Sequence, residues 1–170
     1  VPTAVDREGG NKTVFAEATT RGQKQPPADT NSAYSITHLA AIHPSGSISA
    51  FSKAAGIVNT GNSKALEIAR NTVKMINRVT DFAPGNGFCL NWNAAAQVHA
   101  NRNESHALLT NFSNAYARKV KQNGWPDLDG GGLEQIGAVD ALRMLMVRVV
   151  DGVLHLFVGI PEGVPVSFRS

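Results

Sequence analysis

Cys89 and His155 are the residues whose types could together carry nucleophilic catalysis. Cys89 directly precedes a predicted helix, and the N-terminus of a helix favours the thiolate form, which is the nucleophile. A cysteine nucleophile needs a general base, and His155 on a predicted C-terminal strand could supply it. The sequence therefore permits a Cys-His hydrolase. The alternative is that Cys89 is a small buried hydrophobic residue.

The order of these two residues, a nucleophile at a helix start and a base on a later strand, resembles that of papain-like and cell-wall peptidase folds. The resemblance covers this layout only. It implies hydrolytic activity for Cys89 and His155 and adds no further site residue.

The remaining histidines do not have the spacing of metal ligands. His38 and His43 fall on opposite faces of one predicted strand, and His99 and His106 belong to different predicted helices. No other Cys, His, Asp or Glu residues recur at the intervals that zinc sites use. We therefore expect no metal and no other cofactor.

The last thirty residues contain the strongest structural signal, an antiparallel hairpin. Residues 142–150 and 153–160 are mostly apolar or β-branched. Asp151-Gly152 between them suits a two-residue type I′ turn, in which both residues have positive φ. This register places Arg148 opposite His155, and residues 164–168 are a candidate third strand.

The preceding chain contains a second hairpin and a helical region. Residues 34–52 predict a hairpin that turns at Pro44-Ser45-Gly46. Apolar spacings of three and four predict helices over residues 63–79 and about 104–122, with a short alanine-rich helix over about 91–100 between them. We expect an α+β fold in which the N-terminal hairpin and a C-terminal hairpin or three-stranded meander form one antiparallel sheet. Two or three helices are inserted between them and packed on one face.

The domain organisation follows from length and composition. Residues 1–33 are mostly polar and are interrupted by glycines and prolines, as is typical of an extended N-terminal arm. Residues 34–170 are long enough for a single α+β domain.

Composition limits the classes of partner. Charged residues make up 17% of the chain, against about 25% in an average soluble domain, and low charge suits a surface that is buried against copies of the same chain. The net charge is +3, but the basic residues form no extended patch, so nucleic acid is not favoured as a partner. The one local cluster, Arg118, Lys119 and Lys121, ends a predicted helix, where cations stabilise the helix dipole. The sequence contains no run of 18 apolar residues, so it predicts no membrane span.

These features favour a non-enzymatic structural subunit that assembles with copies of itself, in an extracellular or virion-type assembly, through its sheet and N-terminal arm. The predicted strand 142–150 is apolar on both faces, so both faces must be covered. We expect Met144, Met146, Phe157 and Val158 to be interface or core residues.

A third interpretation comes from a resemblance. Residues 40–70 predict a hairpin ending in Ala50-Phe51, followed by a glycine and a helix. Together with the Asp151-Gly152 hairpin, they resemble small profilin-like ligand-binding domains. The resemblance covers less than half of the chain and implies a small-molecule binding module without defined site residues.

Overall fold

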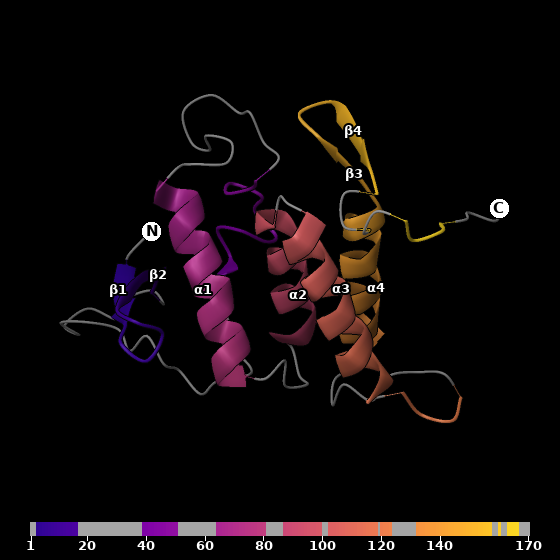
Figure 1. Cartoon of the computed structure of the whole chain (residues 1–170), viewed down its shortest axis with the longest axis horizontal. Helices are drawn as coiled ribbons and strands as arrows, with labels where there is room; N and C mark the ends of the chain where they lie inside the picture. Colours follow the sequence, from indigo (N-terminus) through magenta and orange to yellow (C-terminus); the bar gives the residue numbers. More distant parts are fainter. Residues whose placement is uncertain are drawn as a thin grey trace.

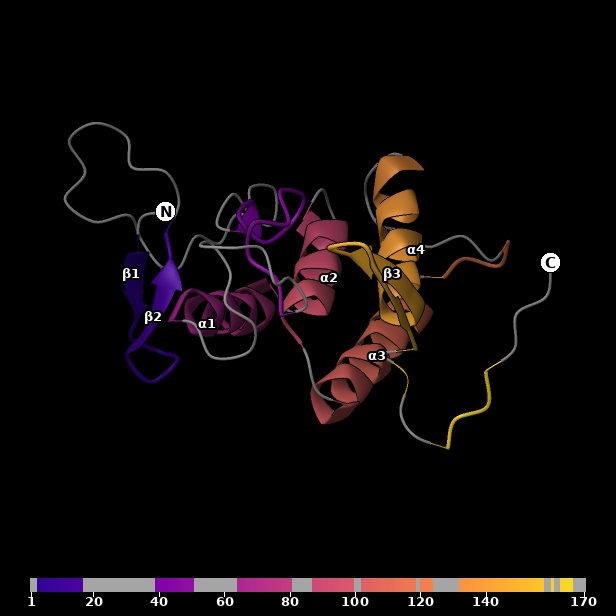
Figure 2. The same cartoon turned by 90° about the horizontal axis from the view of Figure 1, so that it is seen from above.

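The computed structural model describes residues 3–16, 39–50, 64–80, 87–99, 102–118, 120–123, 132–157, 160 and 163–166. Within these residues, four helices lie between two small antiparallel hairpins, so the chain has the expected α+β fold (Figure 1). The two hairpins lie far apart: the first is at one end of the molecule, and the second lies beside the last helix, toward the other end (Figure 2).

The first hairpin pairs β1 (Thr3–Asp6) with β2 (Lys12–Phe15). Gly10 and Asn11, with φ of 83° and 58°, turn the chain into β2. Val14, Phe15 and Ala16 are buried in the hydrophobic core. This part of the segment that we predicted as an extended arm is therefore a core-packed hairpin, because three consecutive apolar residues outweigh the polar composition around them. Residues 17–33 lie outside the described residues, so the proposed domain boundary stays a prediction.

Helix α1 (Lys64–Thr80) holds the first hairpin in place and agrees with the predicted helix over 63–79. Oγ1 of Thr72 accepts a hydrogen bond from the backbone N–H of Phe15 at 2.8 Å and donates to the carbonyl of Ile68 at 2.7 Å. The N–H of Phe15 is thus satisfied inside the protein, as a buried backbone donor must be.

The hairpin predicted over 34–52 is wrong in its described part. Residues 39–50 form successive turns, with hydrogen bonds from the N–H of Ile42 to the carbonyl of Leu39 at 2.8 Å and from the N–H of Gly46 to the carbonyl of Ile42 at 3.1 Å. Leu39 and Ile42 are fully buried. Their apolar character therefore reflects burial in the core rather than strand pairing. Residues 34–38 and 51–52 lie outside the described residues.

Helices α2 (Gly87–Val98) and α3 (Arg102–Ala117) follow the predicted order with shifted ends. Trp92 of α2 meets Phe112 of α3 edge to face, with ring centroids 5.1 Å apart. Where α1, α2 and α3 meet, Nε of Arg70 donates to the carbonyl of Val98 at 2.9 Å. Oε2 of Glu104 lies 3.5 Å from Nδ1 of His99 and 3.9 Å from the Arg70 guanidinium.

Helix α4 (Gly132–Met146) includes residues 142–146, the first half of the strand that we predicted over 142–150. The chain changes to β3 (Val147–Val150) without an intervening loop. The physical reason is side-chain shape: residues 141–146 are Ala, Leu, Arg and Met, which favour helix, whereas three of the next four residues are β-branched valines.

The second hairpin pairs β3 with β4 (Val153–Leu156) and confirms the predicted turn and register. Asp151 and Gly152 have φ of 50° and 75°, as a type I′ turn requires, and Arg148 stands opposite His155. Residues 164–166 of the candidate third strand are not in a strand.

The two hairpins form separate two-stranded sheets rather than the single sheet that we expected. The first hairpin is fixed to α1, and the second continues from the end of α4 at the other end of the molecule (Figure 1). The intervening helices therefore keep the two hairpins apart.

Candidate functional site

A polar network joins the 39–50 segment to α2 and α4. Nδ2 of Asn93 lies 3.1 Å from Nε2 of His43 and donates to Oδ2 of Asp140 at 3.3 Å. Oδ1 of Asp140 accepts from Nε of Arg143 at 2.7 Å. One buried amide therefore connects two elements that are far apart in the sequence.

These contacts favour a neutral His43 ring. The Asp140 carboxylate can only accept, so the NH2 group of Asn93 faces it. The same NH2 group faces Nε2 of His43, which must therefore carry a lone pair rather than a proton. Burial lowers the pKa of His43 and outweighs the opposite effect of the Asp140 charge, in agreement with a neutral ring.

The network has the residue types of an acid–base site but not the geometry. Nε2 of His43 already accepts from Asn93, so it could take a proton from a substrate only after that contact is broken. We interpret the network as a structural connection between the 39–50 segment, α2 and α4.

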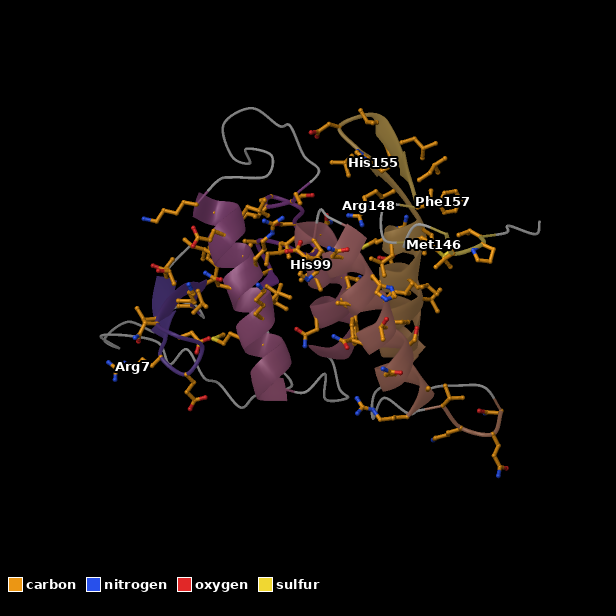
Figure 3. The ribbon with its side chains drawn as sticks, viewed as in Figure 1. Arg7, His99, Met146, Arg148, His155 and Phe157 are labelled. Atoms are coloured by element: carbon orange, nitrogen blue, oxygen red, sulfur yellow. The ribbon has the colours of Figure 1, made fainter. Side chains whose placement is uncertain are left out.

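The inner side of the second hairpin is anchored to α2 by a buried arginine. Arg148 is 5% exposed, and its NH1 group donates to the carbonyl of Ala96 at 2.8 Å. Burial, with the nearby charge of Arg143, lowers the pKa of Arg148 to about 10, so the side chain stays charged at neutral pH. Figure 3 shows Arg148 near the base of the hairpin and His155 farther along it.

The outer face of the hairpin, which we define as Val147, Val149, Leu154 and Leu156, is aliphatic. Val147 pairs with Leu156 and Val149 pairs with Leu154. Because side chains alternate along a strand, all four lie on the side opposite Arg148. Val149, Leu154 and Leu156 are 67%, 57% and 51% exposed. This small sheet therefore turns a continuous aliphatic face to solvent.

The described residues do not test whether Cys89 and His155 meet. Cys89 belongs to the first turn of α2, and its side chain lies outside the described residues. His155 is half-buried on a hairpin that contacts α2 at Ala96, about two helical turns or about 10 Å farther along the axis. A Cys89–His155 site stays a prediction without support from this geometry.

The predicted interface residues differ in their surroundings. Met144 is buried within the chain, and Met146 and Phe157 are half-buried. The N–H of Phe157 donates to the carbonyl of Met146 at 2.6 Å, which extends the hairpin by one bond at its base (Figure 3). Val158 lies outside the described residues. An interface role for these four residues stays a prediction.

Sequence reasoning missed the contacts of Asn93 with His43 and Asp140. The partners are 50 and 47 residues away from Asn93 in the chain, so no local spacing could reveal them. One signal was present: Asn93 interrupts an apolar, alanine-rich segment, and a buried amide requires partners.

Metal sites and membrane-spanning helices are both absent from the described ranges. No group of three His, Cys, Asp or Glu residues there could hold a metal ion. No helix in the described part of the chain is long and apolar enough to cross a membrane. Comparisons with protein-family models, with curated proteins and with solved structures gave no match to this chain.

Proposed function

We propose that this protein is a non-enzymatic structural subunit that assembles with copies of itself through the outer face of its C-terminal hairpin. The exposed aliphatic face of β3 and β4 carries the proposal. A two-stranded hairpin is marginally stable in water unless a further surface covers it. Contiguous exposed apolar residues mark sites of association.

The low charge of the chain supports another copy as the partner. Only 17% of its residues are charged, and none of the four outer-face residues is. Burial of this face would therefore desolvate no charged group on either copy. Paired in a two-fold contact, each face would meet an identical aliphatic face. An extracellular or virion-type assembly remains part of the proposal on the same ground of composition.

The N-terminal segment has a smaller place in the proposal than the sequence suggested. Residues 3–16 belong to the fold of the subunit itself, since Val14 and Phe15 are core residues. Deleting this segment would damage the subunit and could not test assembly. The hydrolase and profilin-like alternatives gain no specific observation from the described residues.

The test is the molar mass in solution, measured by size-exclusion chromatography with light scattering. We expect the unmodified chain to form a species larger than its 18.0 kDa monomer. Val149→Lys combined with Leu154→Lys should shift it to the monomer, because each lysine would place a charge in the contact. The matched control is Val5→Lys, since Val5 is a 44% exposed valine on β1 at the other end of the molecule.

Two results would contradict the proposal. One is a monomeric unmodified chain at every concentration tested. The other is an assembly whose mass is the same in the outer-face variant and in the Val5→Lys control. Circular dichroism of each variant would establish that it is folded.

A further inference from the structure

The backbone of β4 has hydrogen-bonding groups that point away from its hairpin. In an antiparallel pair, hydrogen-bonded and non-hydrogen-bonded positions alternate. The N–H of Phe157 donates to the carbonyl of Met146 at the base of the hairpin, and the pairing is continuous from there to the turn. Leu154 and Leu156 are therefore at non-hydrogen-bonded positions, so their N–H and C=O groups point away from β3.

This edge of β4 is open. Within the described residues, no hydrogen bond ends on the N–H or C=O of Leu154 or Leu156. No lysine or proline interrupts β4, although these residues commonly protect strand edges. On the opposite edge, the carbonyl of Val147 in β3 already accepts from NH1 of Arg143 at 3.4 Å. A further strand would therefore add to this sheet at β4.

We infer that β4 pairs antiparallel with β4 of a second copy, which joins the two hairpins into one four-stranded sheet. In this pairing, Leu154 of each copy is opposite Leu156 of the other, around a two-fold axis at His155. Each pair exchanges both of its N–H and C=O groups, so the contact forms four hydrogen bonds.

Strand geometry selects this register. A shift by one residue would turn the outward groups of one copy away from those of the other. A shift by two residues toward the turn would place Leu156 opposite Gly152, a turn residue with φ of 75°. A shift in the other direction would take the pairing past Phe157, whose φ of 55° ends the extended strand.

The size of the outer face supports a second copy as the partner. A single outer face, four residues long and two strands wide, measures about 13 Å by about 10 Å. This is small compared with the surface of about 800 Å² that each partner buries in a specific interface. Edge pairing places two outer faces side by side and doubles their width. The inference rests on the proposed function, since it adds a second contact to assembly through the outer face.

Disulfide crosslinking tests the register. At the two-fold axis, the His155 residues of the two copies are opposite each other at a non-hydrogen-bonded position. Their Cα atoms would be about 4.5 Å apart, which is within the range of a disulfide. In a Cys89→Ala background, which removes the only native thiol, His155→Cys should form a covalent dimer on oxidation.

Val153→Cys in the same background is the matched control. Val153 is on the same side of β4 as His155, and it is more accessible, with 49% of its surface exposed. In the inferred register, the Val153 residues of the two copies are four residues apart along the strands, or about 13 Å. This variant should form at least about fivefold less dimer, because that distance is too long for a disulfide.

A proline tests the backbone hydrogen bonds. Leu154→Pro removes an N–H that points to the second copy and keeps the bonds between β3 and β4, as proline does on an edge strand. Combined with His155→Cys, it should weaken dimer formation about tenfold. Leu154→Ala shortens the same side chain but keeps the N–H, so it should retain most of the crosslinking. Circular dichroism would establish that each variant is folded.

Three results would overturn the inference. The first is an equal dimer yield from His155→Cys and Val153→Cys, which would indicate random collision. The second is an equal loss of crosslinking in Leu154→Pro and Leu154→Ala. The third is an assembly larger than 18.0 kDa in which His155→Cys does not crosslink, and this result would leave the outer-face contact intact.

The two contacts can be separated. His155-specific crosslinking in a chain whose assembled mass is unaffected by Val149→Lys with Leu154→Lys would support edge pairing and contradict the outer-face contact. A monomeric unmodified chain at every concentration would contradict both.

Discussion

Arg148 is buried and His43 and His99 are half-buried, and each of these three basic side chains has a different kind of partner. His43 contacts an amide, His99 lies beside the Glu104 carboxylate, and Arg148 donates to a backbone carbonyl. Burial lowers the pKa of each of the three. The fold thus favours neutral imidazoles, while the guanidinium keeps its charge.

The two histidines predict that stability depends on pH. Their pKa values are below 6.5 in the folded chain, with burial as the main cause, and return to about 6.5 on unfolding. The unfolded chain therefore binds more protons in the window below pH 6.5, so the stabilisation is complete above that pH and is lost as the pH falls. We expect the temperature of the unfolding midpoint to decrease as the pH is lowered from 7.5 to about 5.5.

The measurement is thermal unfolding followed by circular dichroism across this range. His43→Gln combined with His99→Gln should flatten the pH dependence. His106→Gln, which changes an exposed histidine of α3, should leave it intact. An unchanged slope in the double variant would contradict the assignment to these two side chains.

At the scale of elements, the sequence of a turn predicted its structure correctly, whereas an apolar run did not distinguish helix from strand. The Asp151-Gly152 turn was correctly predicted because positive φ is a local requirement of the turn. The end of α4 at Met146 was not, because a continuous apolar run fits a buried helix as well as a buried strand. The first hairpin was missed because its apolar residues are few and gain their role from the face of α1.

We expect the first hairpin to contribute to the stability of the fold. Phe15→Ala should lower the free energy of unfolding by about 3 kcal/mol, because it removes a core side chain that is 4% exposed. Val5→Ala on the same hairpin should change it by less than about 0.5 kcal/mol, because Val5 is largely solvated. Urea unfolding of both variants measures the difference. Equal, small effects would mean that the hairpin is not part of the core.

At the scale of the whole molecule, the core and the proposed contact face lie in different regions. The helices form most of the core: the first hairpin is built into that core, and the second turns an aliphatic face outward.

Assembly also predicts a dependence on concentration. If only folded chains associate, the thermal midpoint should rise with protein concentration, since association stabilises the folded state by mass action. The Val149→Lys and Leu154→Lys variant should have a midpoint that is independent of concentration. Differential scanning calorimetry over a hundredfold range of concentration measures both. A constant midpoint for the unmodified chain would agree with a monomer and contradict the proposed function.

The sequence by itself determined the features that local chemistry controls. These are the α+β class, the helix over residues 64–80, the type I′ turn and the pairing of Arg148 with His155. Each depends on residues that are neighbours along the chain or across a two-residue turn.

Only the tertiary structure decided which of these elements meet. It separated the two hairpins, placed Asn93 against His43 and Asp140, and left the outer face in solvent while burying Arg148 on α2. Contacts between residues about fifty positions apart depend on how helices pack, and packing is set by the summed burial of many side chains. No single spacing in the sequence contains that sum.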